Sequence, residues 1–309
     1  MSDPFVRPDV RQFLDYLENL DRPKSHELGP EGARQMMVAG RYALDAPARE
    51  IAVVRDIAGP APLRLYDSKA ERGEGPVLVF IHGGGWVIGD LETHEPLCIE
   101  LAIALDLPVI AVDYRLAPEH PFPAAFDDSL AAARWIASAP AELGRTPTGL
   151  FLAGDSAGGN LAAVVAAALR DDPAASPVVG QWLIYPAADP TVRYPSYDQF
   201  LDGYLLTKAA MDWFDESYAG PRNDWRFSPM QAGMAGLPPT FVLTAGLDPI
   251  RDQGRAYAAR CAEAGVETIY LEAEGTIHGF LNLRKAVPSA NDDLARCLAY
   301  LKPWVERAR

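Results

Sequence analysis

Short apolar runs alternate with longer segments of helical periodicity through the middle and the end of the chain. Turn residues bound each run, and this alternation predicts a mostly parallel sheet with helices on both faces. The predicted strands are 76–82, 108–113, 149–153, 181–186, 240–245 and 267–271. The predicted helices are 93–105, 124–138, 159–170, 252–264 and 290–307. An earlier pair, 50–56 and 62–67, predicts an antiparallel edge, so the pattern indicates an α/β fold.

Two segments do not follow this alternation of strands and helices. They are residues 1–45 and 190–226, and both are predicted to be helical. The first carries Val10, Phe13, Leu14 and Leu17 on one face, and the second carries Met211, Phe214 and Tyr218 after a capping Thr207. An apolar helix face needs a surface to cover, and open α/β sheets hold their sites at the C-terminal edge. We therefore expect both segments to form a cap over that edge, with the core in two parts, 46–189 and 227–309.

Two glycine-rich motifs follow predicted strands, first His82–Trp86 and then Gly154–Gly158. The second has the pattern G-x-S-x-G, in which a sharp strand-to-helix turn lifts the hydroxyl of Ser156 away from the backbone. Its glycines let the strand and the helix approach closely. The first motif is a loop of the kind that presents backbone N–H groups to a developing oxyanion. A nucleophile and a donor loop in this order indicate acyl-transfer chemistry.

A serine hydroxyl needs a base to activate it, and the base needs an acid to orient it. Among five histidines, His278 is the predicted base because it lies on a glycine-flanked loop after a predicted strand. The acid should follow a strand between serine and histidine, as Asp248 does. Asp252 is the alternative, although a carboxylate one turn further on would start the next helix and favour its dipole. The order serine, acid, histidine is that of the α/β-hydrolases.

Composition limits the partners of this protein. The 309 residues are 49% hydrophobic, which is an ordinary globular mix, and the formal net charge of −14 argues against nucleic acid and anionic membranes as partners. Three cysteines without a C-x-x-C motif favour buried thiols in a reducing compartment over disulfides. The N-terminus shows no signal-peptide pattern, so we expect a cytoplasmic protein. His94 and Cys98 have a metal-like spacing without further ligands, so we expect no metal.

Five sequence blocks together resemble the hormone-sensitive-lipase-like family, or family IV, of bacterial esterases within the α/β-hydrolases. The blocks are His82–Trp86, Asp113–Ala124, Gly154–Asn160, Asp248–Asp252 and His278–Phe280. The resemblance runs from about residue 50 to the C-terminus, and the N-terminal helices resemble the family's cap. It implies an α/β-hydrolase fold and a triad of Ser156, Asp248 and His278. It also implies oxyanion donors, which would be the N–H groups of Gly83, Gly84 and Ala157.

The predicted function is hydrolysis of carboxylic esters with short to medium acyl chains, through an acyl-enzyme and without a cofactor. Trp86 and Tyr204 are expected to line the substrate pocket, His82 to fix the glycine loop by hydrogen bonding, and Asp155 to be a structural acid. The sequence leaves open an amide or carbamate substrate, a lipase, a non-catalytic receptor of the same family, and a homodimer.

Overall fold

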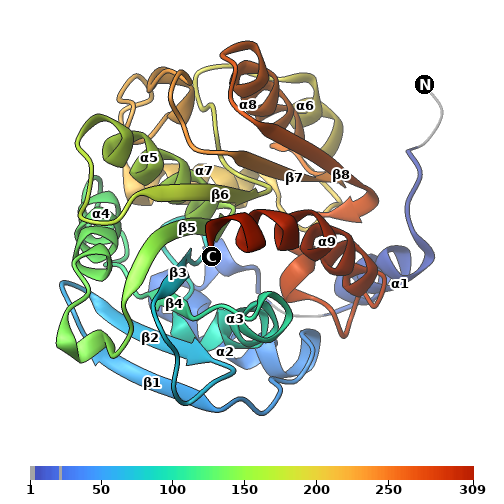
Figure 1. The fold of residues 1–309 in the computed structure, drawn as a ribbon. Helices are drawn as coiled ribbons and strands as arrows, with labels where there is room; N and C mark the ends of the chain where they lie inside the picture. The colour runs from blue at the N-terminus through green and yellow to red at the C-terminus, as the bar shows by residue number, and fades with distance from the viewer. Residues whose placement is uncertain (1–3, 21–22) are drawn as a thin grey trace.

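An eight-stranded sheet forms the centre of the computed structural model, which describes residues 4–20 and 23–309 (Figure 1). The strands are β1 (Val53–Ala58), β2 (Pro62–Asp67), β3 (Gly75–Ile81), β4 (Val109–Val112), β5 (Pro147–Asp155), β6 (Val178–Ile184), β7 (Thr240–Leu247) and β8 (Thr268–Ile277). Their order is β1-β2-β4-β3-β5-β6-β7-β8, and only β2 pairs antiparallel, with β1 and with β4. The predicted parallel sheet and antiparallel edge are confirmed.

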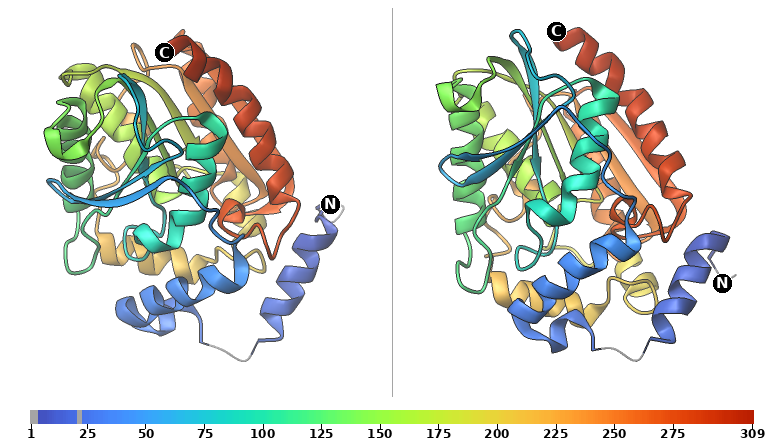
Figure 2. Two further views of the ribbon diagram at one scale, coloured as in Figure 1. Left: turned by 60° about the horizontal axis from the view of Figure 1, so that its bottom comes forward. Right: turned by 90° about the horizontal axis from the view of Figure 1, so that it is seen from below.

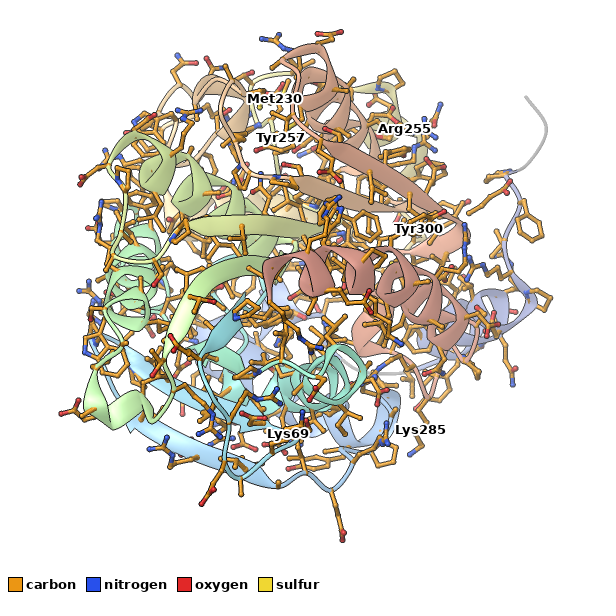
Figure 3. The ribbon with its side chains drawn as sticks, viewed as in Figure 1. Lys69, Met230, Arg255, Tyr257, Lys285 and Tyr300 are labelled. Atoms are coloured by element: carbon orange, nitrogen blue, oxygen red, sulfur yellow. The ribbon has the colours of Figure 1, made fainter. Side chains whose placement is uncertain are left out.

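Helices cover both faces of the sheet, and each face has its own apolar core. The helices α4 (Ala124–Ala137), α5 (Ala157–Asp171) and α8 (Arg251–Glu263) contribute to one core. The helices α3 (Leu91–Leu105) and α9 (Ala290–Ala308) pack on the other face. Figure 3 shows side chains filling the space between both layers and the sheet. The predicted α/β architecture is therefore confirmed. Within the described residues, no helix combines the length and the apolar character needed to cross a membrane.

Strand β8 is longer than predicted, and its extension matters for the site. The sequence predicted a strand over 267–271, whereas β8 runs to Ile277 and delivers His278 at its end. Glu272 and Glu274 obscured the extension, because acids within a strand resemble a loop. β8 is an edge strand, where polar side chains can remain hydrated. Arg255 of α8 reaches Glu272 from the neighbouring helix layer, with 2.8 Å between Nε and Oε2 (Figure 3).

The N-terminal segment and the 190–226 insert gather at one end of the sheet, as Figure 2 shows. Their elements are α1 (Pro8–Glu18), the short 3₁₀ helix η1 (Ser25–Glu27), α2 (Gly29–Leu44), α6 (Pro195–Phe200) and α7 (Lys208–Tyr218). Residues 1–3 and 21–22 of the expected 1–45 segment lie outside the described residues. On α1, Val10, Phe13 and Leu14 are buried in a core that also includes residues of α9. The role of α1 as part of a cap stays a prediction.

Two arginine contacts join α2 and its end to the core. Arg34 donates to the backbone oxygens of Val87 and Ala117, at 2.8 and 2.9 Å. At the end of α2, Asp45 forms a two-bond ion pair with Arg284, with Nε–Oδ1 at 2.9 Å and Nη2–Oδ2 at 3.0 Å. Asp45 and Arg284 are only 2% and 5% exposed. The second contact therefore ties the N-terminal segment to the chain that follows His278.

Asp45→Asn should destabilise the fold strongly, because it leaves the buried guanidinium of Arg284 without its negative partner. We expect a loss of about 3–5 kcal/mol in the free energy of unfolding, measured by urea titration. The exposed Glu50→Gln is the control and should change this value by less than about 0.5 kcal/mol. Equal stability of the two variants would show that the buried pair contributes little.

Candidate active site

Ser156 lies at a turn so tight that its backbone adopts a left-handed conformation. It links β5 to α5 with φ of 56°, and its N–H donates to the oxygen of Ile184 at 2.8 Å. A Cβ on Gly158 would lie 1.9 Å from the backbone oxygen of Ile81, and one on Gly154 would lie 2.5 Å from the same atom. Only glycine fits at these two positions. The close approach places the serine beside the end of β3.

His278 and Asp248 form a continuous hydrogen-bonded line with the serine. His278 Nε2 lies 2.8 Å from Ser156 Oγ, and Nδ1 lies 2.7 Å from Asp248 Oδ2. The other oxygen of Asp248 accepts the N–H of Ile250 at 2.9 Å. Asp248 is fully buried and His278 is 8% exposed, and the ring of Tyr185 lies 4.8 Å from the imidazole. The three residues predicted from chain order therefore lie together, at the ends of β5, β7 and β8.

Asp252 performs a different task. Its Oδ2 accepts the N–H of Ser196 at 3.0 Å, and its Oδ1 accepts from Arg251 at 2.8 Å. Ser196 in turn donates its hydroxyl to the oxygen of Pro249 at 2.9 Å. The alternative acid thus joins the insert to the turn that carries Asp248, and the histidine contact belongs to Asp248.

The glycines of the His82–Trp86 loop differ in the partners of their backbone N–H groups. The N–H of Gly83 donates to Oδ1 of Asp155 at 2.8 Å, in a buried bond that directs it away from the cavity. Gly84, Gly85 and Ala157 line the cavity together with Ser156. Within the described residues, the N–H groups of Gly84 and Gly85 have no protein acceptor. The predicted use of Gly83 as an oxyanion donor is therefore corrected, because Asp155 already accepts its N–H, whereas the N–H groups of Gly84 and Gly85 are not engaged in this way.

A buried polar group lies beneath this loop. Nδ1 of His82 lies 2.8 Å from the oxygen of Gly83, and its ring stacks on Tyr114 with 4.3 Å between centroids. Burial lowers the pKa of His82 to about 4, so it is neutral and donates from Nδ1 to that oxygen. His82 thus fixes the loop by hydrogen bonding. The neighbouring Asp155 is buried and accepts the backbone N–H of Gly83 from this loop, and its role as a structural acid stays a prediction.

A cavity of about 650 Å³ opens at the serine and extends under the insert. Its apolar wall includes Met37 of α2 and Met211 and Phe214 of α7. Trp86 also lines it, and its ring stacks on Tyr218 with 4.7 Å between centroids. Tyr204 instead packs edge-on against Phe200 and is not among the cavity-lining residues of the described chain. Leu205 and Leu206 line the cavity in its place, and sequence periodicity carried no signal for this one-residue difference.

In the described residues, no group of three or more His, Cys, Asp or Glu side chains is placed to hold a metal ion. His94 and Cys98, which share a metal-like spacing, both lie buried in α3. His94 faces Asp155, with 3.1 Å between Nε2 and Oδ1.

Comparison with known proteins agrees with this geometry. Residues 78–282 match a family described by its alpha/beta hydrolase fold. The chain is 36% identical to the carboxylesterase NlhH of Mycobacterium tuberculosis, over 98% of each chain. It is 34% identical to an ethyl acetate hydrolase of Pseudomonas putida, over 96% of this chain and 98% of that one. An ester hydrolase from the metagenome of Lake Arreo, solved with a bipyridine phosphonate derivative, superimposes with a TM-score of 0.91 at 41% identity, covering 96% and 98%.

Asp248→Asn should reduce ester turnover far more than Asp252→Asn. The first variant presents an amide to His278 and cannot stabilise a positive imidazole, whereas the second affects a contact of the insert. We expect a gap of at least about 100-fold in kcat between the two purified variants. Similar losses in both would assign the orienting role to neither acid alone, and a larger loss for Asp252→Asn would overturn the assignment.

Proposed function

The chain belongs to the hormone-sensitive-lipase-like family of α/β-hydrolases and is a carboxylic ester hydrolase, and we propose that Ser156, His278 and Asp248 are its catalytic triad. The observation that carries this proposal is the unbroken line from Ser156 Oγ to Asp248, with links of 2.8 and 2.7 Å. The serine end of this line opens into the cavity, which Gly84, Gly85 and Ala157 also line. The histidine in this line also disfavours a receptor that has lost its catalytic base.

In the acylation step, Ser156 Oγ attacks the ester carbonyl while His278 Nε2 accepts the hydroxyl proton. Asp248 holds the imidazole through Nδ1–H and stabilises its positive charge. The carbonyl oxygen becomes negative and is stabilised by the N–H groups of Gly84, Gly85 and Ala157. Ala157 can donate because it is the first residue of α5, where an N–H lacks an intrahelical partner.

The alcohol leaves when His278 gives its proton to the ester oxygen, which regenerates the carbonyl as an acyl-enzyme. Water then enters, and His278 takes one of its protons as the oxygen attacks the acyl carbon. The second oxyanion uses the same donors, and its collapse returns the proton to Ser156 and releases the acid. Every proton transfer in this cycle passes through His278, and the backbone N–H groups only stabilise the two oxyanions by hydrogen bonding.

The proposed substrates are esters of short to medium acyl length. The cavity of about 650 Å³ has apolar lining from Met37, Met211 and Phe214, so an acyl chain gains apolar contact only as far as it stays inside the cavity. The relative named as an ethyl acetate hydrolase supports this class of substrate.

A cytoplasmic location is part of the proposal. Cys98, Cys261 and Cys297 are free and buried thiols, which suits a reducing compartment.

Ser156→Ala should abolish hydrolysis of p-nitrophenyl butyrate, with a loss of several orders of magnitude in kcat. Ser176→Ala is the matched control: Ser176 is also buried, but its hydroxyl bonds the oxygens of Ala137 and Pro147. We expect the control to keep its activity. Near-normal turnover by folded Ser156→Ala protein would disprove the proposed nucleophile.

The acyl preference can be tested with p-nitrophenyl esters from C2 to C16. We expect kcat/KM to be highest within about C2 to C8 and to fall for longer chains, because each methylene contributes binding only inside the cavity. A steady rise to C16 would contradict the proposed substrate class. The matching p-nitroanilides should react much more slowly, and equal rates would favour an amide hydrolase.

A further inference from the structure

His94 is a buried ionisable residue outside the substrate cavity and outside the proposed mechanism. It lies in the first turn of α3 and is 1% exposed. Its Nε2 lies 3.1 Å from Oδ1 of Asp155, the residue that precedes the nucleophile. Its ring is also close to His82, with 5.6 Å between centroids. A histidine in this position contacts the support of the glycine loop without reaching the substrate.

Polar groups flank both nitrogens of the His94 ring. Nδ1 lies 2.9 Å from the hydroxyl of Thr93, which is also 2.9 Å from the oxygen of Asp90. On the other side, Nε2 lies at ion-pair distance from Oδ1 of Asp155, without a hydrogen bond of good geometry. The contact between His94 and Asp155 is therefore electrostatic, and it is strongest when the imidazole is protonated and the carboxylate is ionised.

The shifts in pKa agree with this charged pair. Burial alone lowers the pKa of His94, but the negative Asp155 outweighs it and the pKa is raised. Burial alone raises the pKa of Asp155, but His94 and the N–H of Gly83 bring it below its usual value. The positive helix N-terminus of α3 opposes a cation at His94, so the carboxylate is what keeps the charge there.

Asp155 joins three parts of the site. Its Oδ1 accepts the N–H of Gly83 at 2.8 Å. Its Oδ2 accepts the side-chain N–H of Asn282 at 3.2 Å, and Asn282 follows His278 by four residues in the chain. The approach to the loop is very close, because a Cβ on Gly83 would lie 2.5 Å from Oδ2. The orientation of this carboxylate therefore fixes where the chain enters Gly84 and Gly85.

We propose that His94 is a positioning residue for ester hydrolysis, which holds Asp155 in the orientation that sets the oxyanion donors. This inference rests on the proposed function. Without the imidazolium, the buried carboxylate loses its positive partner and must take up a proton or turn away. Either change weakens its bond to Gly83, so the N–H groups of Gly84 and Gly85 move relative to Ser156. The expected effect is weaker stabilisation of the transition state, because those N–H groups bind the negative charge that develops there.

Two substitutions at His94 and one control separate positioning from packing. His94→Phe keeps an aromatic ring beside Phe80 but removes both ring nitrogens, whereas His94→Gln keeps a polar N–H group in place of Nε2. Leu101→Ala is the control, because Leu101 is a fully buried residue of the same helix that lies two turns further on. All three are compared at equal folded fraction, measured by circular dichroism.

The first readout is the split between kcat and KM for p-nitrophenyl butyrate. We expect His94→Phe to lower kcat by about 10- to 100-fold, with KM changed by less than about threefold. His94→Gln should recover part of the loss, and Leu101→Ala should lower stability while kcat stays within about twofold.

The second readout is inhibition by a trifluoromethyl ketone, whose adduct with the serine carries an oxyanion. We expect its inhibition constant to rise in His94→Phe by the same factor as kcat/KM falls, while the corresponding alcohol binds unchanged. A kcat in His94→Phe that matches Leu101→Ala, or an unchanged ketone affinity, would overturn the inference. An inactive wild-type protein would instead contradict the proposed function, so the two failures are distinguishable.

Discussion

The close approach of two backbone segments is the constraint on which the site depends. Gly158 of α5 packs against the oxygen of Ile81 at the end of β3, where a methyl group would lie 1.9 Å away. The parallel register pairs Ile81 with Gly154, so β3 and β5 end side by side. The nucleophile turn and the glycine loop follow from those two ends. A larger side chain at Gly154 or Gly158 would move Ser156 away from the proposed oxyanion donors.

Three buried carboxylates connect segments at and near the proposed site, each with a partner that offsets the cost of burial. Asp248 faces His278, Asp155 faces His94 and the Gly83 N–H, and Asp45 faces Arg284. An unpaired charge at such depth would be expelled or neutralised. These pairs therefore specify geometry rather than add much net stability, because the attraction mostly replaces lost hydration.

Much of this arrangement could be predicted from the sequence, since apolar runs and chain order report directly on strands and on the triad. The sequence did not distinguish between nearby residues of similar type where the choice of residue depends on the direction in which a group points. Gly83 and Gly85 are equivalent as sequence letters, and only the bond from Gly83 to Asp155 distinguishes them. Tyr204 and Leu205 likewise differ only in which of them points into the cavity. The bond from Arg34 to Val87, which directly follows the glycine loop, spans more than fifty positions, and periodicity carries no information over that distance.

Both segments near the cavity are tied to the core by buried contacts. The N-terminal segment is fixed by a buried ion pair at Asp45 and by two backbone acceptors of Arg34. In the insert, Ser196 is fully buried, its N–H donates to Asp252, and its hydroxyl donates to the oxygen of Pro249. Exposed ion pairs between residues of the insert contribute about 0–1 kcal/mol each, whereas a buried polar group that loses its partner costs about 1–3 kcal/mol. Buried contacts rather than surface ion pairs therefore hold the insert beside the cavity.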